Sequence, residues 1–334
     1  MASIPISVHL ETHKNLRALN ILRDLPSVAD LIELCFSSTM DSEGQRYIQD
    51  MRRAGQDSNF LRWATKVAES TSLPLTGYVW EENGKIVGNA SLVPFRHNGK
   101  HIYLIANVAV HPDFRRRGIA RALTERALQH AKQRKVSSTW LHVRDDNQGA
   151  IKLYTDLGFR ERARRTTWQV AKDQATQQRL NSDTTIGIRE PRYWPQQQDW
   201  LRRNYPDELA WYQAWNFSPL QPGLWNWLYL AFVDLNVQQW IATRVNDWPT
   251  AGQHLEAAAA WIPSMRDSNS LWLAADPKSS PEAVTALLIH ARRALSYHTN
   301  LTLDYPADEL IGAIIDAGFR PVRTLIWMET RSAT

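Results

Sequence analysis

Residues 107–120 read Asn107-Val-Ala-Val-His-Pro-Asp-Phe-Arg-Arg-Arg-Gly-Ile-Ala120, and they join a short β-branched strand to a basic turn and then to a strongly helical segment. Backbone N–H groups at the start of a helix have no partner within the helix, so a turn that directs them at one point can hold a pyrophosphate. Gly118 permits close approach of the backbone, and the small Ala120 leaves that approach open. Cationic donors that suit phosphate oxygens come from Arg115, Arg116 and Arg117.

A second block follows at residues 147–159, Asn147-Gln-Gly-Ala-Ile-Lys-Leu-Tyr-Thr-Asp-Leu-Gly-Phe159. In their order and spacing, the two blocks resemble the GCN5-related N-acetyltransferases (GNAT). That family's acetyl-CoA motif is Arg/Gln-x-x-Gly-x-Gly/Ala, and its later helix reads Asn-x-x-Ala-x-x-Leu-Tyr-x-x-x-Gly-Phe. The resemblance implies an α/β fold with a mostly antiparallel, twisted mixed sheet flanked by helices. It also implies acetyl-CoA as co-substrate and a primary amine as acceptor.

The resemblance further implies a role for individual residues. Tyr154 would be the general acid toward the CoA sulfur, although it could also simply brace its helix on the sheet. Asn147 would hydrogen-bond the cofactor arm, and backbone groups beside a splayed strand would polarise the thioester carbonyl. The residues expected to bind the cofactor are Val108, Ala109, Val110, Arg115, Arg116, Arg117, Gly118, Ile119, Ala120, Asn147 and Tyr154.

The general base is left open, because Ile105-Ala106-Asn107 supplies no carboxylate where many family members carry one. Deprotonation of the amine could run through waters held by Asn107, which we count as a catalytic residue, and by backbone carbonyls. Glu81, Glu82 and His142 are the other candidates, and His142 fits a structural histidine better. Asp145-Asp146 could attract a cationic amine, but a solvated turn is the favoured interpretation.

Composition limits the remaining possibilities. A length of 334 residues suits two domains, and the single Cys35 excludes an internal disulfide, which fits a cytoplasmic protein. No leader or apolar run of membrane-spanning length is recognised, and no His, Cys or Asp cluster has metal-ligand spacing, so neither a membrane nor a metal is expected. The net charge of +5 is concentrated near the basic turn and on helix faces, so nucleic-acid binding is not favoured.

Apolar periodicity and turn residues predict the element order of the first half. Asn83-Gly84 between two apolar runs is a strong hairpin signal. Helices are expected over residues 24–36, 42–53, 118–134 and 147–157, and strands over residues 75–82, 85–94, 102–110, 139–143 and 159–170.

An internal repeat predicts that the second half is a diverged copy of the first. A shift of 160 residues places Gly158-Phe-Arg over Gly318-Phe-Arg. Ala307 then replaces Asn147, Ile314 replaces Tyr154, and the arginine turn has no counterpart. We therefore expect a catalytic domain over residues 1–170, a polar linker over 171–185, and a degenerate domain over 186–334 that does not bind acetyl-CoA in the usual way.

The second half holds eleven of the fifteen tryptophans. They are expected to fill the core and the interdomain seam, with an aromatic-walled acceptor pocket over residues 205–215 as the alternative. The sequence names neither the acceptor, a small molecule or a peptide, nor the oligomeric state. A non-catalytic acyl-CoA-binding or interaction module is the alternative function.

Overall fold

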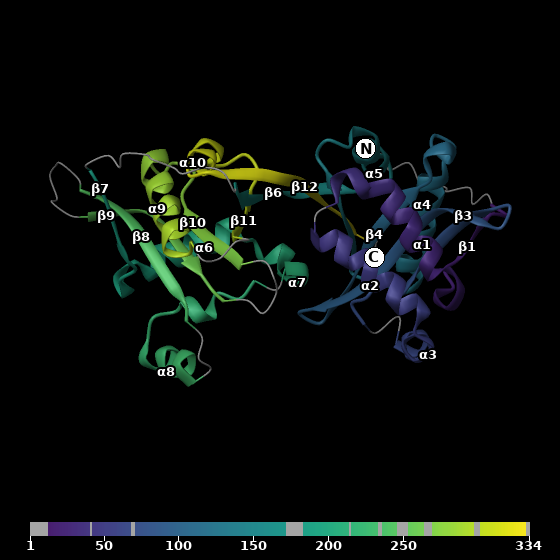
Figure 1. Cartoon of the computed structure of the whole chain (residues 1–334), viewed down its shortest axis with the longest axis horizontal. Helices are drawn as coiled ribbons and strands as arrows, with labels where there is room; N and C mark the ends of the chain where they lie inside the picture. The colour runs from purple at the N-terminus through teal and green to yellow at the C-terminus, as the bar shows by residue number, and fades with distance from the viewer. Residues whose placement is uncertain are drawn as a thin grey trace, which may run out of the picture. The chain divides into compact units, whose positions relative to one another are not determined.

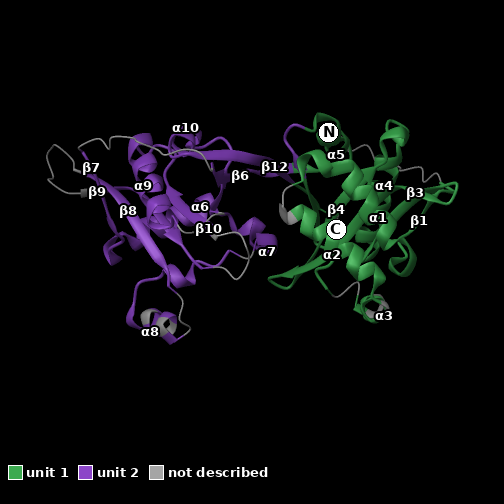
Figure 2. Ribbon diagram, in the orientation of Figure 1, with its two compact units in different colours: residues 1–142, 147–160, 328–334 green, residues 143–146, 161–327 purple. Residues whose placement is uncertain are grey.

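The chain divides into two units, which Figure 2 shows in different colours. Unit 1 consists of residues 1–142, 147–160 and 328–334, and unit 2 consists of residues 143–146 and 161–327. Neither unit is continuous in sequence. The computed structural model (Figure 1) describes residues 13–40, 42–67, 71–171, 183–213, 215–232, 236–245, 253–263, 269–296 and 301–331.

Unit 1 holds five strands in the order β1-β2-β3-β4-β5. The first four are antiparallel to their neighbours, and β5 lies parallel to β4. The strands are β1 (Leu16–Ala18), β2 (Thr76–Glu82), β3 (Lys85–His97), β4 (Lys100–Val110) and β5 (Ser138–Arg144). The helices are α1 (Ile21–Phe36), α2 (Ser42–Gln56), α3 (Ser58–Val67), α4 (Ile119–Gln133) and α5 (Gln148–Asp156).

Helices cover both faces of this sheet. On one face, Val79 and Ala109 pack in a core with apolar residues of α1 and α2. Tyr78 precedes Val79 on β2 and therefore points to the other face, where its hydroxyl lies 2.9 Å from Nδ1 of His130 on α4. A Cβ at Gly88 of β3 would lie 2.8 Å from Ile119 Cγ2. Glycine at this position thus lets the start of α4 lie close against the sheet.

Asn-Gly turns set the register of unit 1. The expected hairpin forms at Asn83 and Gly84, both of which have positive φ, 52° and 76°. A second one, at Asn98 and Gly99 (φ 48° and 71°), joins β3 to β4. Because of this turn, both strands are longer than expected from the sequence. β3 ends at His97 rather than at residue 94, and β4 begins at Lys100 rather than at residue 102. The same dipeptide signal was present at both places in the sequence.

Unit 2 holds a second set of sheet strands in the order β12-β6-β11-β10-β9-β8-β7. Its strands are β6 (Arg160–Val170), β7 (Thr184–Ile188), β8 (Gln238–Val245), β9 (Gln253–Trp261), β10 (Asn269–Ala275), β11 (Leu301–Pro306) and β12 (Phe319–Arg331). Its helices are α6 (Trp194–Asn204), α7 (Ala210–Gln213), α8 (Leu224–Phe232), α9 (Pro281–Ala294) and α10 (Ile311–Asp316). In the described part of this unit, β10 and β11 pair in parallel, whereas β11–β6, β10–β9, β9–β8 and β8–β7 pair antiparallel.

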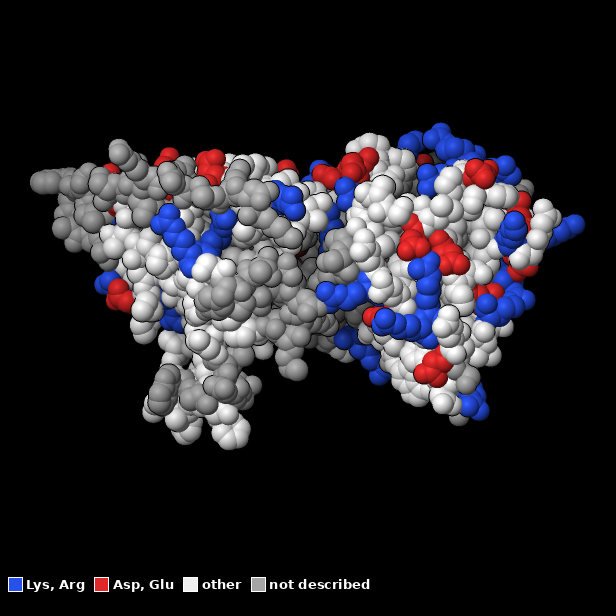
Figure 3. Space-filling view, in the orientation of Figure 1, with Lys and Arg blue, Asp and Glu red and all other residues white. Residues whose placement is uncertain are grey.

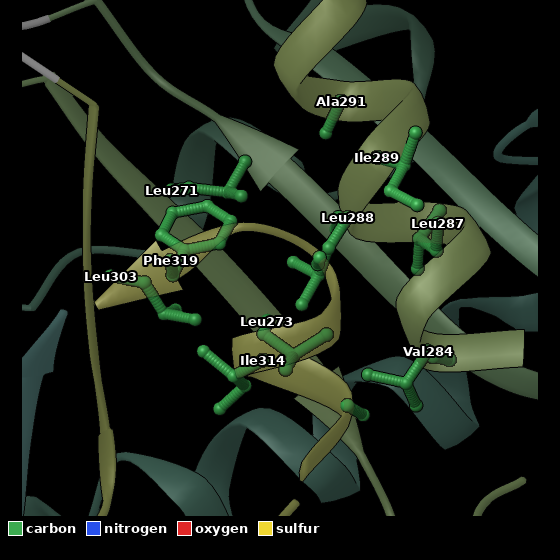
Figure 4. Close-up of a cluster of buried hydrophobic side chains, with 14 of the residues drawn as sticks. Leu271, Leu273, Val284, Leu287, Leu288, Ile289, Ala291, Leu303, Ile314 and Phe319 are labelled. Atoms are coloured by element: carbon green, nitrogen blue, oxygen red, sulfur yellow. The ribbon is translucent and has the colours of Figure 1, made fainter. Parts of the chain in front are cut away.

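The two faces of the second sheet carry separate cores. Leu271 and Leu273 of β10 pack against Leu287 and Leu288 of α9 (Figure 4). Ala274, whose side chain points the opposite way, belongs to a core with aromatic residues of α6 and the loops after it. Several tryptophans are buried as expected, among them Trp200, Trp211, Trp240, Trp261 and Trp327. Trp225 on α8, in contrast, is 84% exposed.

The expected fold class is confirmed, since both units are mixed sheets flanked by helices and share one order of elements. That order is β2-β3-β4-α4-β5-α5-β6 in the first half and β8-β9-β10-α9-β11-α10-β12 in the second. The expected linker falls mostly outside the described residues, which omit 172–182. The division into domains at residue 170 stays a prediction. The two units exchange strand residues, because residues 161–170 of β6 group with unit 2 and Met328 onward of β12 with unit 1.

Candidate functional site

A β-bulge interrupts β4 at Asn107. Ala106 lies opposite Ser91 and Ala109 lies opposite Asn89, so β4 has two residues between these pairs where β3 has one. Asn107 takes the left-handed conformation, with φ of +54°. Asparagine is among the few side chains that tolerate this region, which explains why the sequence carries it here. The bulge turns the backbone of residues 107 and 108 out of the regular ladder.

β4 and β5 separate beside this bulge. The two strands pair only over three residues, Ile102 with Ser138, Tyr103 with Thr139 and Leu104 with Trp140. β4 continues to Val110 without further pairing to β5. In this fully described stretch, the backbone groups of residues 108–110 that face β5 therefore have no strand partner. An extended amide chain, such as a pantetheine arm, could complete the ladder at that edge.

The basic turn leads from β4 into α4. Gly118, with φ of +79°, precedes the first residue of α4, and no side chain caps the helix. A Cβ added at Gly118 would meet nothing within 4 Å. The space beside Gly118 is thus open at an uncapped helix start, and helix N-termini are places where phosphate binds. The phosphate cradle expected from the sequence stays a prediction.

The arginines of the turn are partly used to brace it. Arg115 Nε donates to the Val110 carbonyl at 3.1 Å, and Arg117 Nη2 donates to the Asp113 carbonyl at 3.0 Å. Arg116 takes a left-handed conformation with φ of +65°. Because each guanidinium has five N–H donors, one bond to the turn leaves others for an anion. Their role as phosphate ligands stays a prediction.

Tyr154 is buried on α5, with 6% of its surface exposed. Burial raises the pKa of its phenol to about 12, so the hydroxyl keeps its proton throughout the neutral range. Its ring meets that of Phe159 edge to face at 6.0 Å. Asn147 begins the same helix, and its Oδ1 accepts from Ala150 N at 3.1 Å. This cap leaves the Asn147 amide nitrogen as the group that could contact a cofactor.

Known proteins resemble the part of the chain that carries this site. Residues 29–159, which carry the bulge, the turn and Tyr154, match the model of the acetyltransferase (GNAT) family. The first half of the chain is therefore similar to the GNAT family. Its sheet also resembles that of a GCN5-related N-acetyltransferase from Sphaerobacter thermophilus, with a TM-score of 0.55 over 96% of this chain and 98% of that one. At 13% identity, this likeness concerns the fold alone.

Two curated GNAT relatives match parts of the chain. One is the [ribosomal protein bS18]-alanine N-acetyltransferase of Escherichia coli K12, 42% identical over 67 residues, which are 20% of this chain and 45% of that protein. The other is the mycothiol acetyltransferase of Saccharomonospora viridis, 31% identical over 117 residues, or 35% of this chain and 36% of that protein. This chain therefore spans less than half the length of each of these relatives.

The GNAT family uses acetyl-CoA, and the candidate bases differ in how available they are. Glu81 is ion-paired to Arg17 at 2.6 Å, and Glu82 accepts from Trp80 Nε1 at 3.1 Å. His142 lies half-buried on β5, and Asp146 is ion-paired to Arg144 at 2.8 Å, which lowers the pKa of its carboxyl. These pairings occupy both glutamates and Asp146, so they weaken each of them as a base.

Two residues beside the bulge were missed by the sequence interpretation. Asn89 of β3 is fully buried, and its Nδ2 donates to the Asn107 carbonyl at 2.9 Å. Tyr47 of α2 accepts from Asn107 Nδ2 at 2.8 Å. The available signal was the asparagine itself, which is a polar residue within the apolar run of a predicted central strand. Nothing in the spacing of Tyr47 pointed to the bulge.

The corresponding strand pair of unit 2 is closed by its own side chains. β10 and β11 also pair in parallel over three residues, ending with Leu271 and Leu303. Beyond that point, Tyr205 at the end of α6 accepts from Leu273 N at 3.1 Å, and Asn204 Nδ2 donates to the Ala275 carbonyl at 3.3 Å. The strand groups that a pantetheine arm would need are therefore already bonded within unit 2. Tyr205 belongs to a packed core, which also counts against an open aromatic pocket at residues 205–215.

No group of three or more His, Cys, Asp or Glu side chains could hold a metal ion in the described part of the chain. No helix of the described ranges is long and apolar enough to cross a membrane. On the face drawn in Figure 3, acidic and basic side chains are interspersed over unit 1 rather than gathered by sign.

Proposed function

We propose that this chain is an acetyl-CoA-dependent N-acetyltransferase that moves an acetyl group to a primary amine. The main support is that unit 1 contains both a bulged edge of β4 that pairs with no strand and an uncapped start of α4. An anion-binding helix start and an amide edge without a strand partner are the two features that a nucleotide with an amide-containing arm requires. The family model that matches residues 29–159 and the similarity to the bS18 alanine N-acetyltransferase support the same activity.

In this proposal, the first amides of α4 and the arginines of the turn hold the pyrophosphate, and residues 108–110 hold the pantetheine arm. Backbone N–H groups at the bulge donate to the thioester carbonyl, which makes its carbon more electrophilic. The amine nitrogen bonds to that carbon and loses a proton, while the carbon–sulfur bond breaks. Tyr154, kept protonated by burial, donates its proton to the departing sulfur.

The base in this scheme is water held near Asn107, since Glu81 and Glu82 have other partners. The acceptor is a small molecule or a peptide that carries a primary amine, the class to which the bS18 alanine enzyme's protein substrate belongs. The second unit shapes the acceptor site or stabilises the fold, and binds no acetyl-CoA of its own.

Release of free CoA thiol tests the proposal. The full chain is incubated with acetyl-CoA and panels of small amines and of peptides with different N-terminal residues, and thiol is detected over time. Faster release with one amine class than with buffer supports the enzyme. Binding of acetyl-CoA by calorimetry with no release for any amine would favour the alternative, an acyl-CoA-binding module. Absence of binding would contradict both.

A further inference from the structure

We propose that Asn89 is a positioning residue for acetyl transfer, because it fixes the peptide at the β4 bulge. This inference rests on the proposed function and extends it to a side chain on the neighbouring strand. Asn89 would touch neither the amine nor the cofactor. It would act through the backbone of Asn107 and Val108.

The contact of Asn89 with the bulge is direct. Its Nδ2 donates to the Asn107 carbonyl at 2.9 Å and lies 3.2 Å from Ser91 Oγ. The side chain has no exposed surface. A carbonyl oxygen can only accept, so the Asn107 carbonyl fixes which end of the Asn89 amide faces it. The hydrogen bond therefore sets the orientations of both groups.

Asn107 is also held by a hydrogen bond to a residue of α2. Its own Nδ2 donates to Tyr47 Oη at 2.8 Å, while its backbone stays at φ of +54°. Two independent hydrogen bonds, one to its carbonyl and one from its side chain, thus fix a residue in a sparsely populated conformation. Surroundings that determine a strained residue in this way are typical of functional sites.

The orientation of this peptide has a chemical consequence. In a trans peptide, the C=O and the following N–H point in opposite directions. Because the Asn107 carbonyl points to Asn89, the Val108 N–H points away from Asn89 and out of this polar cluster. An N–H group stabilises the charge that develops on the thioester oxygen most effectively when it already points at that oxygen before the reaction begins. Asn89 supplies that preorganisation for Val108.

Apart from this hydrogen bond, asparagine at position 89 is unfavourable for the stability of the strand. Asparagine is a poor strand former, and the Oδ1 of Asn89 is buried without a hydrogen-bond partner among the described residues. A valine or leucine would suit a fully buried central strand better. Places where a sequence breaks a local rule are expected at functional sites, and the bond to the bulge carbonyl is the gain that accompanies this one.

Infrared spectroscopy of bound acetyl-CoA, labelled with ¹³C at the thioester carbonyl, tests the proposal without knowledge of the acceptor. In the wild type, the carbonyl band should lie below that of free acetyl-CoA, because a hydrogen bond weakens the C=O bond. In Asn89→Leu, this shift should shrink by about half or more, and kcat should fall about tenfold to a hundredfold with the KM for acetyl-CoA nearly unchanged. Ser91→Ala is the matched control, since it removes the other contact of Asn89 Nδ2 and should keep the wild-type band.

A second variant covers the case in which Asn89→Leu does not fold. In Asn89→Asp, the neutral carboxyl can donate to the Asn107 carbonyl and the ionised one cannot. Its rate relative to wild type should therefore fall as pH rises through the carboxyl pKa, which burial raises. A folded Asn89→Leu with the wild-type band and rate, or a flat ratio for Asn89→Asp, would overturn the role of Asn89. A wild type that binds no acetyl-CoA would instead overturn the proposed function, and this inference with it.

Discussion

At the scale of single residues, Gly118 is the position where one substitution tests the phosphate cradle. Asp at this position places a negative charge beside the first amides of α4, where the space is open enough to accept a side chain. We expect Gly118→Asp to weaken CoA binding at least tenfold, or about 1.5–3 kcal/mol. Gly118→Asn is the matched control, because it has the same shape, tolerates positive φ and carries no charge. Equal affinities for wild type and both variants by calorimetry would show that the pyrophosphate lies elsewhere.

Tyr154 tests the chemistry rather than the binding. Tyr154→Phe keeps the contact with Phe159 but removes the proton donor, so the transfer rate should fall about 100-fold or more while CoA affinity stays. Since the pKa of Tyr154 is raised to about 12, its ionisation should cause no loss of rate below pH 10. Tyr78→Phe, which removes a buried hydroxyl on the α4 face, serves as the control. A wild-type rate for Tyr154→Phe, measured where chemistry limits turnover, would exclude the tyrosine as the acid.

At the scale of elements, a carboxylate joins β1 to α1. Asp24 is 2% exposed, and burial opposes its ionisation, but hydrogen bonds from Arg17, the Asn20 N–H and Arg23 outweigh that effect and lower its pKa. A carboxyl with a lowered folded-state pKa stabilises the fold above its ordinary pKa, and this contribution is lost as pH falls through the folded value. We expect Asp24→Asn to reduce the free energy of unfolding by about 1–3 kcal/mol at pH 7, and by less below pH 4.

Thermal unfolding of wild type and Asp24→Asn between pH 3 and 7 measures this effect. Glu33→Gln is a suitable control, because Glu33 also pairs with an arginine, Arg52, but on an exposed surface where such pairs contribute little. Parallel stability curves for wild type and Asp24→Asn across the whole range would rule out the proposed ionic link.

The sequence predicted individual helices and strands better than the order of the strands and the contacts between distant residues. Helix periodicity, Asn-Gly turns and the arginine turn are local signals, and they located α1, α4, α5 and the β2–β3 hairpin. The short β1 and the helix α3 were missed, since both are brief and weakly patterned. The bulge at Asn107 could not be foreseen because it depends on Asn89 and Tyr47, which are distant in sequence. Strand order is equally non-local, so the placement of β6 and β12 had no sequence signal.

At the scale of the whole molecule, the closed strand pair of unit 2 limits cofactor binding to one site. Tyr205 and Asn204 already bond the groups of β10 that correspond to the free edge of β4. Calorimetry with CoA should therefore give one site per chain. In Gly118→Asp, binding should weaken as a whole, rather than leave half of the sites at full affinity. A stoichiometry of two would show that CoA can displace Tyr205 and Asn204 from the backbone of β10.

Removing the second half should damage the first. Unit 1 includes the end of β12 from Met328 on, and β6 pairs with β11 through Trp168 and Leu303. A chain cut after residue 170 therefore loses strand residues of unit 1 and exposes the apolar side of β6. We expect it to aggregate or to unfold at lower temperature than the full chain, as judged by size-exclusion chromatography and circular dichroism. A monomeric fragment as stable as the full chain would show that unit 1 folds independently.

The exchange of β6 and β12 also has a consequence for synthesis. A ribosome releases residues in sequence order, and domains generally fold N-terminal first as they emerge. Here the first unit cannot be completed until residues 328–331 have left the exit tunnel, because this end of β12 groups with unit 1. The unit that carries the proposed catalytic residues would lack these residues until then. Acetyl transfer would then begin only after residue 331 has emerged.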